Sequence, residues 1–322
     1  MAFAINPAGA TVGAYFDASN LFHGFLRAPD GTFTEFEAPG AGTGMFQGTL
    51  AFSINPAGSI TGYYYDASNV RHGYVRDRHG NFTTFDAPGA GTGPGQGTYA
   101  DSINPEGAIA GDVFDDNNVP HGFLRGPDGI ITTFDAPGAV QGTQVGNFCG
   151  LNPAGAIAGL YLDAGNVYHG YVRAPDSTTT TFDAPGASTG PGQGTIAACI
   201  NPAGTISGPY IDSGGVMHGY VRAPDGEITK YDVPGAGTGP GQGTMDPKIN
   251  TPGDIAGPYL DAGNVYHGFV RTKQGDITTF DVPGAGTGMF QGTYPNANNP
   301  EDAIPGYYID GSGVFHGFLR TP

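Results

Sequence analysis

The chain has 322 residues, including 58 Gly and 27 Pro, and carries 29 acidic against 12 basic residues for a net charge of −17. This balance, without clustered Lys and Arg, argues against binding a nucleic-acid backbone. No run of 18 apolar residues is present, which argues against a membrane-spanning helix. With 20 Phe and 17 Tyr the chain can build a core, so Gly and Pro are interpreted as turn residues rather than as a sign of disorder.

One unit of about 49 residues recurs seven times. The dipeptide His-Gly marks each copy at steps of 49, 49, 48, 49, 49 and 49 residues, and Arg follows each His four residues later. A fixed period of this size indicates a solenoid or a propeller. The copies begin near residues 1, 49, 98, 143, 195, 244 and 293 and are expected to form a single domain over residues 1–322.

The second copy shows the elements that every copy predicts. A strand over residues 49–55 ends in Asn-Pro-Ala-Gly, which is typical of a type I turn. Strands over 59–66, 70–76 and 82–86 follow, joined by tight turns, and a glycine-rich loop over 87–97 leads to the next copy. The strands are rich in β-branched and aromatic residues, and no segment has a helical period. This pattern predicts an all-β fold, a seven-bladed β-propeller of four-stranded antiparallel blades, with the first strand of each copy innermost.

The seventh copy ends differently from the others. Pro322 comes directly after its third strand, and the outer-strand sequence occurs only six times. We therefore expect the last blade to lack its outermost strand, which would normally come from the opposite end of the chain and close the ring. We also expect that a preceding strand and a leader peptide are absent from this sequence. That expectation favours an extracellular or periplasmic protein and leaves a cytoplasmic location open.

The units Ile-Asn-Pro-Ala-Gly-x-Ile-x-Gly and His-Gly-Phe-Leu-Arg resemble the HAF family of bacterial extracellular repeats. Those repeats carry Ile-Asn-x-x-Gly-x-Val-x-Gly followed by His-Ala-Phe-Leu-Trp. The likeness covers all seven copies, but this chain has Gly after the His, Arg in place of Trp, and Phe-Asp-Ala-Pro-Gly in place of Asp-Leu-Gly. The resemblance implies a secreted bacterial propeller and supplies no catalytic residues.

A histidine–carboxylate pair is expected inside each complete blade. If Arg76 lies opposite Phe82 in the outer hairpin, His72 lies opposite Asp86 on the same face. We interpret these pairs as structural clasps rather than metal ligands, because copies spread around a ring cannot converge on one ion. His316 has no such partner in the sequence. The equivalent pairs are His23 with Glu37, His121 with Asp135, His169 with Asp183, His218 with Asp232, and His267 with Asp281.

Other recurring residues also have structural interpretations. The Arg of each copy is expected to pack between blades, with anion binding as the alternative. The Asp that opens the second turn, such as Asp66, is expected to accept backbone N–H bonds rather than to bind calcium. Cys149 and Cys199 are the only cysteines, and we expect them to be unbridged, because a disulfide needs Cα atoms within about 7 Å.

Positions that differ between copies are the candidates for a binding site. Two exit loops carry Met-Phe in place of Pro-Gly, at Phe46 and Phe290. On a propeller the innermost positions face the central channel or its mouth, so we expect a ligand there: a glycan, a peptide or a surface polymer. The alternative is that these positions are solvated and differ between copies through sequence drift, without binding a ligand. Charged or aromatic residues replace the more usual small or apolar ones on or beside the innermost strand at Asp101, Asp112, Asp246, Lys248, Tyr63 and Tyr307.

Three classes of function remain open. The first is a binding or scaffold propeller, expected to be a monomer without cofactor or metal. The second is a lyase or hydrolase with Asp101, Asp246 and Lys248 at a central acidic site, although the sequence has no nucleophile elbow and no metal-ligand cluster. The third is a purely structural repeat protein, or an engineered product of repeat amplification. The glycine-rich loops are not phosphate loops, because no helix and no Lys-Ser/Thr follows them.

Overall fold

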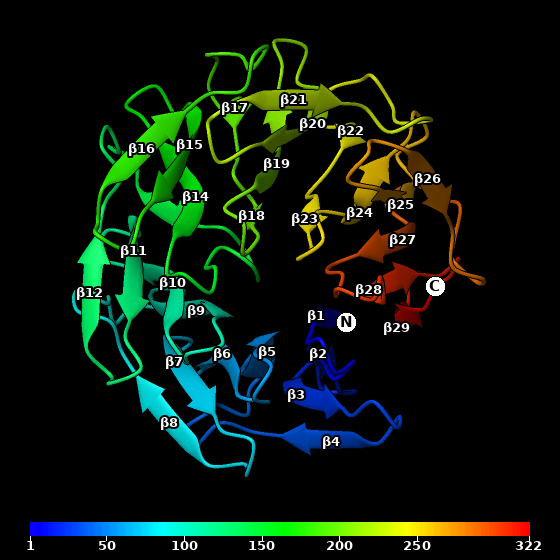
Figure 1. Ribbon diagram of the computed structural model, residues 1–322. Helices are drawn as coiled ribbons and strands as arrows, with labels where there is room; N and C mark the ends of the chain where they lie inside the picture. The colour runs from blue at the N-terminus through cyan, green and yellow to red at the C-terminus, as the bar shows by residue number, and fades with distance from the viewer.

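The computed structural model describes residues 1–322 and consists of 29 β-strands joined by turns and loops, without a helix. It therefore contains no helix that is long and apolar enough to cross a membrane. The strands are arranged in a ring around a central axis, and the two ends of the chain lie next to one another (Figure 1). We number the sequence copies repeat 1 to repeat 7 in chain order.

Each repeat runs from the axis of the ring to its rim. The inner strands are β1 (Ala2–Ile5), β5 (Gly48–Ile54), β9 (Gly97–Ile103), β13 (Thr143–Val145), β17 (Gly194–Thr195) with β18 (Cys199–Ile200), β22 (Gly243–Thr244) with β23 (Lys248–Ile249), and β27 (Gly292–Pro295). The second strands are β2 (Thr11–Phe16), β6 (Ile60–Tyr65), β10 (Ile109–Phe114), β14 (Ile157–Leu162), β19 (Ile206–Ile211), β24 (Ile255–Leu260) and β28 (Ile304–Ile309).

The outer half of each repeat is a hairpin. The third strands are β3 (Phe22–Arg27), β7 (Arg71–Arg76), β11 (Pro120–Arg125), β15 (Tyr168–Arg173), β20 (Met217–Arg222), β25 (Tyr266–Arg271) and β29 (Phe315–Arg320). The outer strands are β4 (Phe33–Phe36), β8 (Phe82–Phe85), β12 (Ile131–Phe134), β16 (Thr179–Phe182), β21 (Ile228–Tyr231) and β26 (Ile277–Phe280). Repeat 7 thus has three strands, and β29 pairs only with β28.

Pairing within a repeat is antiparallel and follows the predicted register. In repeat 2, Arg76 lies opposite Phe82, and Gly73 lies opposite Phe85. The inner strand is less regular than the sequence predicts. In repeats 5 and 6 it is split into two short pieces, and in repeat 4 it stops at Val145. In repeat 6 the break contains Pro247, whose nitrogen has no hydrogen to donate to the ladder.

An aromatic stack recurs at each junction between successive repeats. The last aromatic residue of an outer strand covers the glycine of its own His-Gly pair; a Cβ on Gly24 would come within 2.7 Å of the Phe36 ring. The Arg of the next repeat covers the other side, with Arg76 Cζ 4.9 Å from the Phe36 ring centre. The same stack forms at five further junctions, with Arg–ring distances of 4.7 to 5.0 Å. The predicted packing of Arg between repeats is therefore present, as a cation–π contact.

A belt of asparagine hydrogen bonds ties the repeats together near the axis. The turn residue Asn55 is buried, and its Nδ2 donates to the backbone oxygen of Asn104 in the next repeat at 3.1 Å. Equivalent bonds of 3.1 to 3.4 Å leave Asn6, Asn152, Asn201, Asn250 and Asn299. The bond from Asn299 reaches Asn6, so the belt crosses from repeat 7 to repeat 1. These buried bonds link six of the seven pairs of neighbouring repeats, including repeats 7 and 1. Repeats 3 and 4 have no such bond, and there the Leu151 N–H donates to Ser102 Oγ at 3.4 Å.

Candidate functional site

Aromatic side chains fill the central channel. Phe3, Phe52 and Phe148 come from three different repeats, and their rings stack on one another with centroids 5.1 to 5.6 Å apart. Tyr63 stacks on Phe52, and Tyr99 packs against Tyr63 with centroids 4.3 Å apart. The centre of the ring is thus a packed core over part of its depth, rather than an open pore.

A small pocket remains at the channel mouth, on the face that carries the Asn-Pro turns. It has a volume of about 200 Å³, and its lining comes from all seven repeats. Phe148 contributes an aromatic surface, and Lys248 is the only charged residue in the lining. Ser53, Ser102 and Asn298 add polar groups, and the side-chain oxygen of Asn298 is buried without a hydrogen-bond partner.

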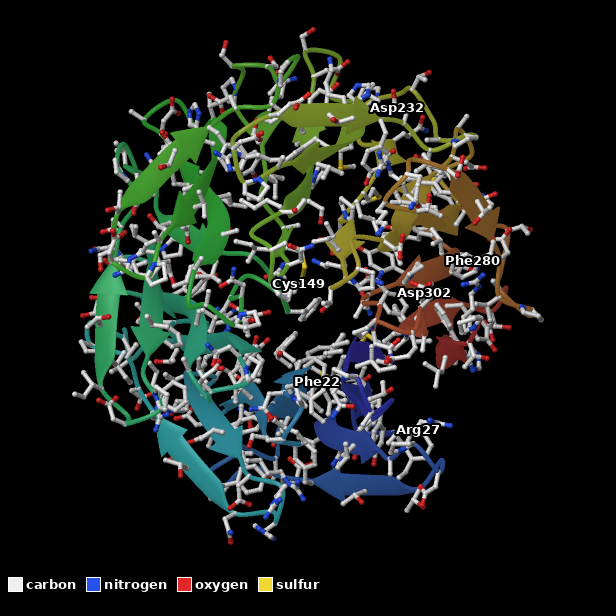
Figure 2. The ribbon with its side chains drawn as sticks, viewed as in Figure 1. Phe22, Arg27, Cys149, Asp232, Phe280 and Asp302 are labelled. Carbon is white, nitrogen blue, oxygen red and sulfur yellow. A yellow bond between two sulfur atoms is a disulfide. The ribbon has the colours of Figure 1, made fainter.

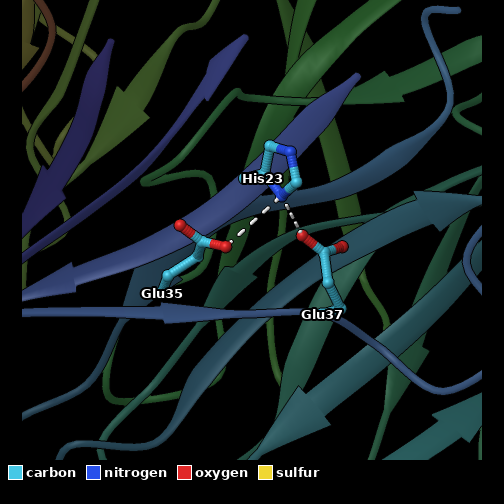
Figure 3. A group of neighbouring side chains, drawn as sticks. All are labelled: His23, Glu35 and Glu37. Carbon is cyan, nitrogen blue, oxygen red and sulfur yellow. Dashed lines mark hydrogen bonds and ion pairs between the residues drawn. The ribbon is translucent and has the colours of Figure 1, made fainter. Parts of the chain in front are cut away.

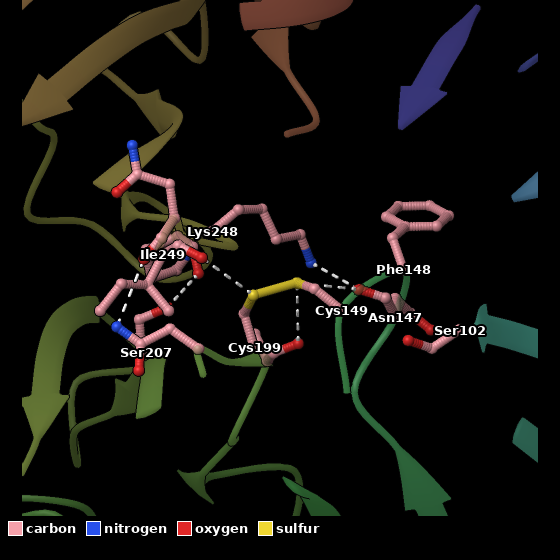
Figure 4. The surroundings of a disulfide bond; sticks show 12 residues. Ser102, Asn147, Phe148, Cys149, Cys199, Ser207, Lys248 and Ile249 are labelled. Carbon is pink, nitrogen blue, oxygen red and sulfur yellow. Dashed lines mark hydrogen bonds between the residues drawn. A yellow bond between two sulfur atoms is a disulfide. The ribbon is translucent and has the colours of Figure 1, made fainter. Parts of the chain in front are cut away.

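Lys248 makes contacts with Asp246, Asn147 and Phe148, and Figure 4 shows its bond to Asn147. Its Nζ donates to Asp246 Oδ1 at 2.6 Å and to the backbone oxygen of Asn147 at 3.3 Å, and it lies 5.3 Å from the centre of the Phe148 ring. An ammonium group has three N–H donors, so one remains for a further acceptor. Phe148 and Asp246 have φ of 69° and 35°, a backbone region that non-glycine residues rarely adopt.

Cys149 and Cys199 form a disulfide beside this pocket, so the expectation of two unbridged cysteines was wrong (Figure 4). Their Cα atoms are 4.9 Å apart, because inner segments of neighbouring repeats converge at the axis, and the two residues form a parallel bridge there. Figure 2 shows Cys149 near the centre of the ring, far inside rim residues such as Phe280. The bridge joins repeat 4 to repeat 5 at the pocket wall.

A pair of buried carboxylates lies in repeat 3, outside the pocket lining. Asp101 is fully buried, and neither of its side-chain oxygens has a hydrogen-bond partner. Burial, followed by the nearby Asp112 carboxylate, raises the pKa of Asp101 well above its ordinary value. Burial raises the pKa of Asp112 to about 8, although the Val145 N–H donates to its Oδ1 at 2.7 Å. These two side chains therefore hold protons at neutral pH more readily than exposed aspartates do.

The structure distributes the eight predicted ligand residues over several places. Lys248 lines the pocket, and Asp246 is bonded to it. Tyr63 is buried in the channel against Phe52 and Tyr99, and Tyr307 stacks on Tyr294 in repeat 7. Phe46 and Phe290 are half exposed, at 52% each, and belong to the exit loops rather than the pocket.

Six histidine–carboxylate pairs form where the sequence predicts them. The His Nδ1 lies 2.6 to 2.9 Å from the Glu37 or Asp oxygen in repeats 1 to 6. A second carboxylate, which sequence reasoning missed, lies on the other ring nitrogen: the turn Asp is 3.3 to 3.8 Å from Nε2. The turn Asp also accepts the backbone N–H bonds predicted for it, as Asp66 does from Ser68 and Val70.

Repeat 1 adds a third carboxylate to its pair. His23 Nδ1 lies 2.6 Å from Glu37 and 3.6 Å from Glu35, and the three side chains face one another (Figure 3). They offer three ligand atoms within 4.8 Å of one another, which is close enough for a metal ion. The hydroxyls of Tyr15 and Thr49 already donate to Glu35 and Glu37. Protein donors therefore account for this cluster as it stands.

Arg71 is a further residue that sequence reasoning missed. It lies within 5.1 to 5.9 Å of four aromatic ring centres, those of Tyr63, Tyr65, Tyr99 and Phe114. The signal was present, because the other six repeats have an apolar residue before the His-Gly pair. Arg71 lies on the third strand of repeat 2, yet its side chain reaches the aromatic rings of the channel, such as Tyr63 and Tyr99.

No model of a known protein family matches the chain, and no curated protein matches it by sequence. Solved structures do resemble it. Streptogramin B lyase matches over 99% of this chain and 93% of its own, with a TM-score of 0.60 and 14% identity. The BP39L lectin from Burkholderia pseudomallei matches over 98% and 95%, with a TM-score of 0.53 and 9% identity. Puromycin hydrolase matches over 99% of this chain and 52% of its own, with a TM-score of 0.56 and 13% identity.

Identities this low show the fold alone. The chain has a β-propeller fold, which lectins and enzymes share.

Proposed function

We propose that the chain is one domain, a seven-bladed binding propeller that acts outside the cytoplasm and holds its ligand in the central pocket. One observation carries the proposal. The pocket lining combines an ammonium group with a spare donor, an unpartnered amide oxygen and an aromatic ring, on Lys248, Asn298 and Phe148. A mostly apolar concave surface with a few convergent polar groups is typical of ligand sites.

The size and chemistry of the pocket favour a small polar unit. About 200 Å³ is below the roughly 300 to 1,000 Å³ typical of sites for drug-sized ligands. A single sugar ring fits this description, with its apolar face toward Phe148 and its hydroxyls toward Lys248 and Asn298. We propose that such a ring belongs to the end of a glycan or surface polymer.

The disulfide supports a location outside the cytoplasm. Disulfides persist in secreted and periplasmic proteins and are rare in reducing compartments. The Cys149–Cys199 bridge also fixes the wall of the pocket between repeats 4 and 5.

A glycan-array screen followed by calorimetry tests this proposal. We expect a hit whose affinity falls at least tenfold in Lys248→Met and Asn298→Leu. Lys273→Met is the matched control, because Lys273 lies exposed in a turn. This variant should bind the glycan with unchanged affinity. A ligand whose binding survives both pocket substitutions, or the absence of any hit, would contradict the proposal.

A lyase or hydrolase is the second candidate, and the buried carboxylates favour it. Asp101 and Asp112 have raised pKa values, as general acids often do. Turnover of a glycan that depends on Asp101, and is lost in Asp101→Asn with binding intact, would favour this candidate.

A further inference from the structure

The channel has a second mouth, at the end opposite the Asn-Pro turns. Strand β6 begins after one of those turns and runs to Tyr65, and Arg71 opens β7 beyond the following turn. There Arg71 pairs with Gly97, where the exit loop enters β9, and its backbone N–H donates to the Gln96 oxygen at 2.9 Å. Figure 1 shows β6, β7 and β9 next to one another. Arg71 therefore lies at the exit-loop end of the channel, between repeats 2 and 3.

Arg71 is the one charged residue at its position in the seven repeats. Six repeats form the same strand with an uncharged residue in this place, so the strand does not require a cation. Partial burial of a guanidinium also costs free energy unless its contacts compensate for it. The presence of Arg71 in repeat 2 therefore needs an explanation other than the fold of the strand. The equivalent residues are Phe22, Pro120, Tyr168, Met217, Tyr266 and Phe315.

Aromatic side chains fix the position of the Arg71 guanidinium. Its Cζ lies 5.1 to 5.9 Å from four ring centres, those of Tyr63, Tyr65, Tyr99 and Phe114. Its Nε also donates to the Tyr65 hydroxyl at 3.2 Å. Because these contacts already set the rotamer of the side chain, binding a ligand there costs little further conformational entropy.

The terminal nitrogens of Arg71 have no acceptor within the chain. A guanidinium has five N–H donors, and Arg71 uses one of them, from Nε to Tyr65. None of the ion pairs in the chain includes Arg71, which is partly exposed. The rim arginines differ, because a terminal nitrogen of most of them donates to an oxygen of the adjoining turn. Those that do so are Arg27, Arg125, Arg173, Arg222 and Arg271.

Two buried carboxyl groups lie close enough to feel the charge of Arg71, but they do not balance it at neutral pH. Burial raises the pKa of Asp101 well above its ordinary value and the pKa of Asp112 to about 8, and it outweighs the opposing effect of the Arg71 charge. Both side chains are therefore largely protonated at neutral pH. Arg71 keeps its positive charge among aromatic rings, where an ion pair is stronger than in bulk water.

The charge at this mouth suits a single negative charge. Seven of the 12 basic residues are the rim arginines, and Lys248 lines the pocket at the opposite mouth. Besides Arg71, the others lie in turns or on an outer strand, at Arg78, Lys230 and Lys273. A carboxylate matches one guanidinium, because its two oxygens accept two parallel N–H bonds. A phosphate would bring up to two charges against one cation, in a chain whose net charge is −17.

We propose that Arg71 binds the carboxylate of a small organic acid at this second mouth. The terminal nitrogens of Arg71 donate to the two carboxylate oxygens. The Tyr65 hydroxyl oxygen accepts the bond from Nε and keeps its own O–H to donate to the same carboxylate. The apolar part of the acid packs against the neighbouring rings, among them Phe114. This site is separate from the central pocket, because none of these three residues lines that pocket.

Fluorobenzoate is the probe, with fluorobenzamide as its uncharged match. By fluorine NMR at neutral pH we expect saturable binding of the acid and at least about tenfold weaker binding of the amide. Arg71→Met gives repeat 2 the residue that repeat 5 has at Met217, and it should lower the affinity for the acid at least about tenfold. Arg71→Lys keeps the charge without the fork and should recover only part of that affinity. Arg78→Met, the matched control, removes an exposed arginine from a turn and should bind the acid as wild type does.

Two further measurements locate the probe and do not depend on how well Arg71→Met folds. Tyr65→Phe keeps the ring beside Arg71, removes one hydroxyl and should weaken binding of the acid several-fold. In wild-type crystals soaked with iodobenzoate, the anomalous signal of iodine should lie next to Arg71. No saturable binding of the acid, equal binding of acid and amide, unchanged affinity in a folded Arg71→Met, or iodine only beside Lys248 would each overturn the proposal.

Discussion

At the rim of the ring repeats 1 to 6 make the same contacts, whereas at the centre the repeats contribute different side chains. The Arg–aromatic–Gly stack and the His–carboxylate pair recur from junction to junction. In the channel, Phe52, Asp101 and Cys149 occupy related positions in successive repeats and have nothing chemical in common. The rim specifies the fold by repetition. At the centre the Asn belt is the recurring link, and contacts that occur only once, such as the Cys149–Cys199 disulfide, add to it.

The largest expected effect tests the recurring contacts. Phe123→Ala removes a fully buried ring between repeats 2 and 3 and should cost about 3–5 kcal/mol in urea unfolding. Phe25 is the equivalent residue in repeat 1 and lines a groove between repeats 7 and 1, so Phe25→Ala should cost less than half as much. Equal losses would mean that this junction is as well packed as the other junctions.

The disulfide has the next largest expected effect and belongs to the centre. It closes a loop over a sequence separation of 50, and the loss of chain entropy in the unfolded state predicts about 4 kcal/mol for a loop of that length. We expect the double variant Cys149→Ser, Cys199→Ser to lose about 2–4 kcal/mol, and wild type in reducing buffer to lose a similar amount. If the melting temperature is unchanged both in the double variant and in reducing buffer, the bridge does not stabilise the folded ring.

The buried carboxylates of repeat 3 predict that the stability of the fold depends on pH. Burial raises the pKa of Asp112 to about 8, so its contribution to stability is complete below about pH 4 and is lost as the pH rises to 8. The wild-type melting temperature should therefore fall between pH 5 and 8.5. In Asp112→Asn the fall should be smaller, and the variant should be more stable than wild type at pH 8.5.

The turn aspartates do not interfere with this measurement. Hydrogen bonds, first from the Leu21 N–H, lower the pKa of Asp17, so its contribution is lost only as the pH falls below about 4. An unchanged slope between pH 5 and 8.5 in Asp112→Asn would remove Asp112 as its cause.

The smallest expected effect concerns the histidine pairs. His72 is largely buried, but its partner Asp86 is about half exposed, so the bond is screened by water. His72→Ala should cost about 1 kcal/mol, toward the low end of the range for lost hydrogen bonds. His316→Ala, which removes one carboxylate contact instead of two, should cost less. A loss of about 3 kcal/mol or more at His72 would make the pair a larger part of the fold than its exposure suggests.

Much of the rim could be predicted because its contacts are local. The partners His72 and Asp86 lie in one hairpin, so strand register alone places them together. The Asn belt escaped prediction because Asn55 bonds to a backbone oxygen 49 residues away, and a backbone acceptor leaves no mark in the sequence. The disulfide was mispredicted because equivalent residues of neighbouring repeats come within 4.9 Å only where the inner segments converge at the axis, and the repeat length of about 49 residues does not give that distance.

The candidate site was harder to predict than the fold. Variation between copies marked the inner strand, and Lys248 on that strand lies in the pocket lining. The same variation also marked Tyr63 and Asp101, whose side chains fill the interior instead. Sequence differences between repeats identify positions near the axis. Whether such a residue lines the pocket or is buried in the channel depends on how the large side chains pack, and that packing does not repeat from copy to copy.

The Asn belt affects how the number of repeats in a chain of this kind can change by recombination. Each of its links runs head to tail, from a side chain of one copy to the backbone of the next, so no link records how many copies the ring contains. Head-to-tail interfaces close at whatever number the rotation per unit allows. Unequal recombination that adds or deletes one copy would therefore preserve the kind of link that makes up the belt, whereas contacts across the channel, such as the Phe3–Phe148 stack, would change. The diameter of the axial pocket would then be the first property to change, so copy number itself can tune what the ring accommodates.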